Sequence, residues 1–167
     1  SWLGWVILVA GALGGILSYR RAGTVTPVNA ESVAARHGIK VETASEIDAQ
    51  EYASTVTICA DGVEAGVTMA AAAQSPRIVS LLDYRIDIAP GRESLVFEYV
   101  DAPGRIGTIG TVLGEAGVNI TTMQVGAKPE ERCALVYVNV EGDVTEAVLD
   151  RLRSAVPDLK NLWHVKL

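Results

Sequence analysis

The chain has 167 residues, of which 20% are charged and 49% are hydrophobic, and its formal net charge is −6. A composition of this kind excludes a disordered tail and predicts a folded protein. The net negative charge leaves no basic stripe for a phosphate backbone, which argues against nucleic-acid binding.

An uncharged run opens the chain, from Ser1 to Tyr19, and Arg20 and Arg21 come directly after it. Its length meets the usual test for a membrane span. No basic segment precedes the run, so a signal peptide is not expected, and a first residue other than Met suggests a piece of a longer protein. Glycines in the run would let a helix pack closely in a soluble core or in a bilayer. We favour a buried helix over a membrane span.

The first half of the chain is interpreted as a small α/β domain that ends at residue 91. Asn29 can cap a short helix that ends at Gly38. Four short segments, most of them rich in β-branched residues, are predicted strands: Ala53–Ala60, Val63–Met69, Ile78–Leu82 and Tyr84–Ile88. Asp61-Gly62 predicts a hairpin between the first two strands, and Ala89-Pro90-Gly91 separates the last strand from the second half of the chain.

The second half has the pattern βαββαβ, which predicts an α+β, ferredoxin-like fold with four antiparallel strands and both helices on one face. The expected elements are strand Leu95–Val100, helix Pro103–Ala116, strands Val118–Val125 and Cys133–Val140, helix Val144–Ala155 and strand Asn161–Leu167. A sheet covered on one face only leaves its other face and its edge strands open. Pairing with a second copy would cover them, so a homo-oligomer is expected.

A candidate site for a small zwitterion lies where the first of these strands turns into a helix. Pro103 suits the first helical position, and Gly104 would let a ligand approach the backbone. The candidate groups are the Tyr99 hydroxyl, the Asp101 carboxylate for an ammonium, the amides of Gly104, Arg105 and Ile106 for a carboxylate, and Asn119 for either end. The plainer alternative is that Asp101 only caps the helix and that Asn119 sits in an ordinary turn.

The chain holds few groups that could carry catalysis or bind a metal. His37 and His164 are interpreted as structural residues, and Cys59 and Cys133 as small core residues without metal-ligand spacing. No Gly-x-Gly-x-x-Gly turn comes after a strand, so no dinucleotide site is expected. The chain alone is therefore predicted to hold no catalytic residue, metal or cofactor, and a reducing cytoplasm is its expected compartment.

Two parts of the sequence resemble a known family. The string Asp101-Ala-Pro-Gly-Arg-Ile-Gly and the later Ala116-Gly-Val-Asn-Ile resemble the ACT domain that ends D-3-phosphoglycerate dehydrogenases. Upstream, Val28-Asn29-Ala30 and the stretch from Ala34 to Ile39 resemble the intervening domain of the longer form of that enzyme. The resemblance divides the chain into an intervening domain over residues 1–91, truncated at its start, and an ACT domain over residues 92–167.

The resemblance implies that L-serine, the product of the pathway, binds between two ACT domains at Tyr99, Asp101 and Asn119 and inhibits the enzyme. It places NAD in a catalytic part that this chain lacks. It also implies that basic residues of the intervening domain bind a second, anionic effector or the substrate, and Arg77 and Arg85 are the candidates. Two alternatives stay open: the regulatory region of an L-serine dehydratase, with iron–sulfur cysteines elsewhere, and a free or membrane-anchored ACT sensor.

Overall fold

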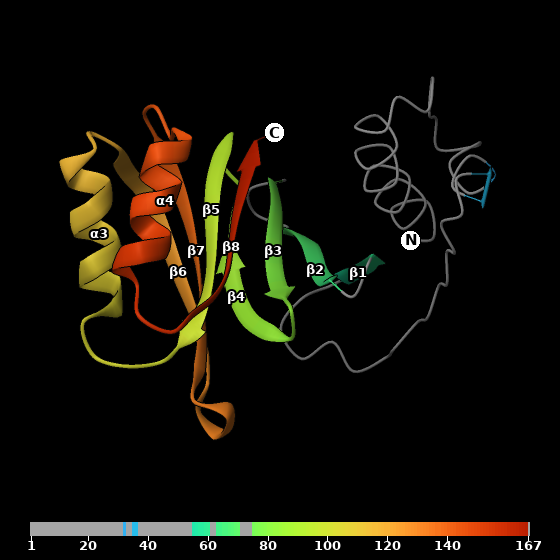
Figure 1. Cartoon of the computed structure of the whole chain (residues 1–167). Coiled ribbons are helices and arrows are strands. Elements are labelled where there is room, and N and C mark those ends of the chain that lie inside the picture. The colour runs from blue at the N-terminus through green and yellow to red at the C-terminus, as the bar shows by residue number, and fades with distance from the viewer. Residues whose placement is uncertain (1–31, 33–34, 37–54, 61–62, 71–74, 167) are drawn as a thin grey trace. The chain divides into compact units, whose positions relative to one another are not determined.

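The computed structural model of the chain describes residues 32, 35–36, 55–60, 63–70 and 75–166 (Figure 1). The uncharged run over residues 1–19 lies outside them, and of the helix predicted before Gly38 the three described residues, Ser32, Ala35 and Arg36, are helical. None of the described helices is long and apolar enough to cross a membrane. The chain divides into two compact units, residues 1–58 and 59–167, and most described residues belong to the second.

The first sheet contains the four strands predicted for the first half of the chain, in the order β1-β2-β3-β4. These strands are β1 (Thr55–Ala60), β2 (Val63–Ala70), β3 (Ser75–Leu81) and β4 (Tyr84–Ile88). The turn between β3 and β4 consists of Leu82 and Asp83, whose φ angles of 51° and 62° are both left-handed. Two such residues match the twist of a tight hairpin. The Leu82 N–H donates to the Glu64 carbonyl at 2.7 Å and helps to hold this turn.

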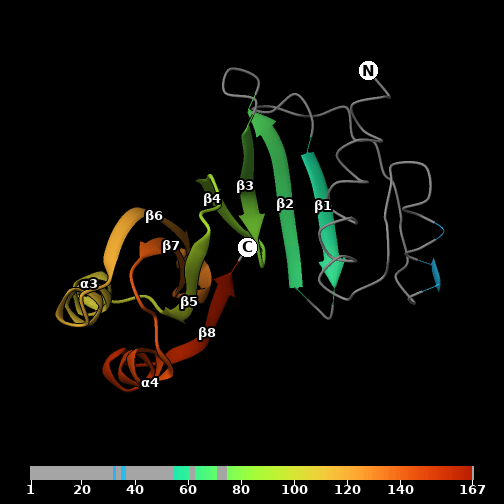
Figure 2. The same ribbon diagram turned by 90° about the horizontal axis from the view of Figure 1, so that it is seen from above.

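The second sheet has the strand order β6-β7-β5-β8, and all of its neighbouring strands are antiparallel. Its elements are β5 (Glu93–Val100), α3 (Arg105–Glu115), β6 (Asn119–Lys128), β7 (Cys133–Glu141), α4 (Glu146–Ala155) and β8 (Leu159–Lys166). Both helices lie on one face of this sheet (Figures 1 and 2). The predicted ferredoxin-like α+β fold is therefore confirmed.

The helix-covered face of the second sheet forms the larger core. Alternate residues of β5, among them Leu95 and Phe97, pack with Ile109 and Leu113 of α3 and with Leu152 of α4. Thr145 begins α4 as its cap, since its side chain accepts from the Val148 N–H at 3.4 Å.

The opposite face of the second sheet differs from the expectation that one chain leaves it open. β4 packs on this face, and its residues Tyr84, Ile86 and Ile88 form a second buried cluster with residues of β5 and β7, namely Val96, Cys133, Leu135 and Tyr137. Consecutive residues are buried from Ser94 to Phe97 in β5 and from Cys133 to Val140 in β7, as expected for a sheet that is covered on both faces. The segment before residue 91 therefore shares a core with the ACT-like part.

β6 continues through Gly126 and ends three residues beyond the strand predicted from the sequence. A Cβ atom at this position would lie 2.6 Å from the carbonyl oxygen of Arg85 and 3.1 Å from Ile86. The glycine is thus not a break in the strand but the point where β4 crosses it. At the end of β6, the Lys128 ammonium donates to the Leu82 carbonyl at 3.2 Å and lies 4.4 Å from the centre of the Tyr84 ring.

We predict that Gly126→Ala destabilises the protein by about 1–3 kcal/mol, the usual cost of overpacking, because backbone atoms cannot move aside cheaply. Gly110→Ala is the matched control. A Cβ at Gly110 meets nothing within 4 Å, so this change should stabilise α3 by up to about 1 kcal/mol. Denaturant unfolding measures the free energy of unfolding of both variants, which should fall for Gly126→Ala and rise for Gly110→Ala. Equal values for the two variants would contradict the close crossing of β4 over β6.

Candidate functional site

The loop from Asp101 to Gly104 joins β5 to α3 and differs from the prediction in where the helix begins. Gly104 is the N-cap residue, with a left-handed φ of 89°, and Arg105 is the first helical residue. Pro103 therefore lies two positions before the helix and not at its first position. The physical reason is that the glycine accepts the positive φ needed to turn the chain into the helix, which proline cannot adopt.

Free backbone donors remain at this helix start. No side chain caps α3, and its first turn holds no acidic residue. The amide N–H groups of Gly104, Ile106 and Gly107 donate to no described acceptor, and the Arg105 N–H reaches the Ala102 carbonyl only at 3.5 Å. Exposed N–H groups at the positive end of a helix attract an anion. The amides predicted to bind a carboxylate are thus largely unpaired, and the Gly107 amide is a further free donor that the sequence did not predict.

Asp101 does not cap the helix, so the alternative that this residue serves only as a helix cap is wrong. Its own N–H donates to the Arg132 carbonyl at 2.8 Å, while its exposed carboxylate makes no hydrogen bond or ion pair with a described residue. Tyr99 stands two residues before it and is only 1% exposed. Burial raises the pKa of the Tyr99 phenol, the Asp101 charge raises it further, and the Arg105 charge lowers it. The three side chains are therefore electrostatically coupled.

The Arg105 side chain is already engaged within the chain. Its guanidinium donates to the Asp158 carboxylate at 3.1 Å and to the Val100 carbonyl at 3.4 Å, and the side chain is only 15% exposed. Asp158 has a left-handed φ of 54°, and its own carbonyl accepts from the Val100 N–H at 3.2 Å. Arg105 thus offers its backbone rather than its charge to a ligand. Sequence reasoning missed Asp158, although an Asp after Pro157 is a typical turn signal.

Asn119 lies at the other end of the sheet from Asp101. In the strand register, Val100 pairs with Cys133 at the start of β7, whereas Asn119 pairs with Glu141 at its end. Eight residue steps along β7 correspond to about 26 Å. Asn119 is exposed at the first position of β6. One chain therefore does not bring together the two residues that the sequence grouped into one site.

The two candidate anion-binding arginines differ in how free they are. Arg77 in β3 pairs through Nε with the Asp87 carboxylate and donates through Nη2 to the Asp87 carbonyl at 2.9 Å. Arg85 in β4 is exposed and forms no ion pair with a described residue. Within the described part of the chain, Arg77 is already neutralised, so an anion would have to compete with Asp87 for it.

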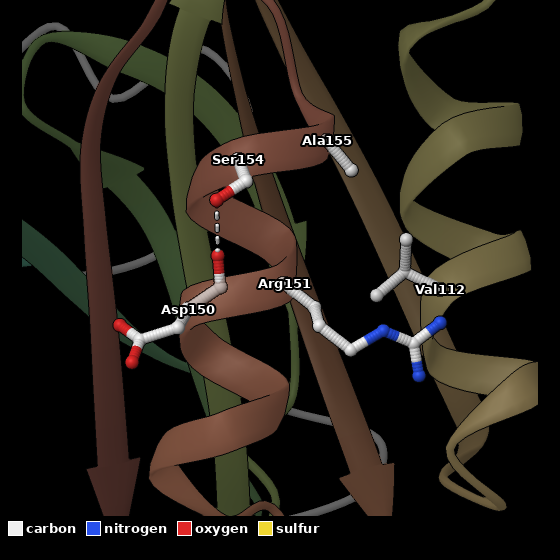
Figure 3. Close-up of a pocket in the computed structure, with 5 residues that line it drawn as sticks. All are labelled: Val112, Asp150, Arg151, Ser154 and Ala155. Carbon is white, nitrogen blue, oxygen red and sulfur yellow. Dashed lines mark hydrogen bonds between the residues drawn. The ribbon is translucent and has the colours of Figure 1, made fainter.

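A depression of about 400 Å³ opens between α3 and α4, away from the candidate residues (Figure 3). Val112, Asp150, Arg151, Ser154 and Ala155 line it. Its polar groups are engaged, because Ser154 donates to the Asp150 carbonyl at 2.9 Å and Arg151 pairs with Glu115 of α3 at 2.6 Å. This depression offers no free charge that would complement a zwitterion.

Comparison with known proteins gives one matching family and several relatives. The ACT domain family matches residues 94–156. D-3-phosphoglycerate dehydrogenase of Mycobacterium tuberculosis is 31% identical over 159 residues, covering 92% of this chain and 30% of the relative. The enzymes of the same name from Synechocystis and Bacillus subtilis are each 29% identical, over 96% and 93% of this chain and 29% and 30% of the relatives. The chain thus spans about 30% of the length of these curated relatives.

We predict that Asp158→Asn loosens the loop before α3, because Arg105 loses its charged partner. The amides of residues 101, 102 and 104–107 should exchange with deuterium faster, while the free energy of unfolding should fall by no more than about 1 kcal/mol, since Asp158 is largely exposed. Glu146→Gln is the control, because it breaks an exposed pair with Arg153 on α4. Equal exchange rates of the loop in both variants would contradict an anchoring role for Asp158.

Proposed function

Because the chain contains an ACT domain homologous to the regulatory C-terminal region of D-3-phosphoglycerate dehydrogenases, we propose that residues 92–167 bind L-serine as a feedback signal between two copies of the chain. The observation that carries this proposal is the pairing of open amides at the start of α3 with an uncompensated carboxylate at Asp101. The amides suit the ligand carboxylate, and Asp101 suits its ammonium.

The second copy is needed because Asn119 lies far from Asp101 within one chain. β6 is an edge strand of ten residues, and no described strand pairs with its outer side. Two-fold pairing of β6 with the same strand of a second copy is antiparallel, so the start of one strand meets the end of the other. The partner's Asn119 then comes to the end of the sheet where Asp101 lies.

Surface composition supports the same interface. Ile106 and Val125, at 42% and 38% exposure, are the large apolar side chains that stay exposed among the described residues. They belong to α3 and β6, the two elements that would face the second copy. Gly107, Gly110 and Gly114 on α3 have no neighbouring atoms within 4 Å of an added Cβ, so a second helix could approach closely.

The wider activity is also a proposal. We infer that the protein takes part in L-serine biosynthesis as a cytoplasmic, homo-oligomeric NAD-dependent dehydrogenase, because the relatives carry the name D-3-phosphoglycerate dehydrogenase. NAD binding and hydride transfer would fall to residues outside this chain. L-Serine would act by favouring one mutual arrangement of two ACT domains, and inhibition results if that arrangement suits the inactive enzyme. Arg85 remains our candidate for a second, anionic effector, with Arg77 contributing only if Asp87 releases it.

Calorimetric titration of the 167-residue chain with L-serine tests the site, with glycine and D-serine as ligand controls. Asp101→Asn should weaken binding roughly 10- to 100-fold, because a charge-assisted hydrogen bond contributes about 1.5–3 kcal/mol. Asp143→Asn removes an exposed carboxylate in the loop before α4 and should leave affinity unchanged. Absence of heat with L-serine, or equal effects of the two variants, would refute the site.

Mixing two defective variants tests whether the site is shared. Asp101→Asn and Asn119→Ala should each bind poorly alone. In a mixed dimer, one of the two interface sites receives an intact Asp101 from one chain and an intact Asn119 from the other, so L-serine binding should partly return. No recovery in a mixture whose subunit exchange is verified would mean that both residues act within one chain or not at all.

A further inference from the structure

A cysteine and a lysine meet on the face of the second sheet that β4 covers, at the end where Asp101 lies. Cys133 opens β7 and Lys160 is the second residue of β8, with β5 running between the two strands. Val100 pairs with Cys133, and Tyr99 pairs with Leu159. Lys160 Nζ lies 2.8 Å from Cys133 Sγ. The thiol is free and its residue is 3% exposed.

The two side chains are hydrogen-bond partners, with the Lys160 ammonium as the donor and the Cys133 sulfur as the acceptor. Within the described residues, the other hydrogen-bond partner of the sulfur is the Glu131 carbonyl, to which it donates at 3.3 Å. Two nucleophilic side chains therefore stand in direct contact, with no group between them.

Several charged groups surround Lys160. The hydrogen bond to Cys133 raises the pKa of the Lys160 ammonium, and the nearby carboxylates of Glu98 and Glu131 raise it further. Peroxides oxidise cysteine sulfur to a sulfenic acid. Lys160 itself is exposed, so its amine is accessible from the surface.

We propose that Cys133 and Lys160 form an intramolecular crosslink when a peroxide oxidises the thiol. Peroxide takes two electrons from Cys133, which becomes a sulfenic acid while one oxygen leaves as water. The neutral Lys160 amine then attacks the sulfur, the S–O bond breaks, and the hydroxide leaves with the amine proton as a second water. The product is an S–N bond, a sulfenamide, and the balance is one thiol, one amine and one peroxide to one sulfenamide and two waters.

The crosslink would tie β7 to β8 across Val100, the residue between Tyr99 and Asp101. The loop that carries the open amides begins at this strand end, so oxidation would reach the candidate ligand site. That consequence rests on the proposed function, whereas the crosslink itself does not. Failure of L-serine to bind would leave the crosslink standing, and failure of the crosslink would leave the ligand site standing.

Peptide mass spectrometry after treatment of the 167-residue chain with hydrogen peroxide tests the proposal. We expect a linked pair of peptides that contain Cys133 and Lys160, lighter than their sum by two hydrogen atoms and separated again by a thiol reductant. Its formation should speed up as pH rises, because the attacking amine must first lose its proton. Lys160→Arg keeps the positive charge but lacks a primary amine, so the sulfur should still oxidise without linking. Lys128→Arg, a change at the neighbouring lysine, should link as the wild type does.

Three results would overturn the crosslink. The first is oxygen added to Cys133 with no peptide joined to it. The second is a disulfide with Cys59 in place of the lysine link. The third is a link that persists in Lys160→Arg. The wild-type spectrum decides between these results even if a variant fails to fold, and Cys133→Ala offers a second chain in which no link can form.

Discussion

Both faces of the four-stranded second sheet are apolar, and other elements of the same chain bury both of them. The helices α3 and α4 cover one face, and β4 covers the other through Tyr84, Ile86 and Ile88. The sequence predicts a domain boundary at residue 91, but side chains on both sides of it pack in one core. Removal of β4 would expose Leu135 and Tyr137. The domain limits at residues 91 and 92 remain a prediction, and any shorter version of the ACT domain would have to replace this cover.

Burial of both faces limits where a second copy can dock. Stacking on the open face of the sheet is no longer possible where β4 lies, so the strand edges β6 and β8 are what the sheet itself still offers. The strand register then decides the geometry of the site, because it sets Asn119 and Asp101 at opposite ends of one sheet. An antiparallel edge pairing reconciles this register with a ligand contacted by both residues.

The sequence predicted the order and type of the described strands and helices because their hydrophobic periods are strong. It was less successful where the backbone departs from those periods. The predicted helix includes Pro103, but the positive φ of Gly104 delays α3, and the predicted strand stops before Gly126, which marks a close crossing instead. Contacts between distant segments, such as Arg105 with Asp158 and Cys133 with Lys160, depend on register and leave no local signal in the sequence.

The loop before α3 is anchored at several points and still leaves donors free. The Val100 and Asp101 N–H groups donate to Asp158 and Arg132, and the Arg105 side chain is held by Asp158. A loop fixed in this way loses little conformational entropy when a ligand arrives. In the proposed site, the Asp101 charge would also select among anions, since a free phosphate would be repelled by the carboxylate that an amino acid's ammonium neutralises. Open amides next to the Asp101 carboxylate would therefore favour a ligand that carries both charges over a simple anion.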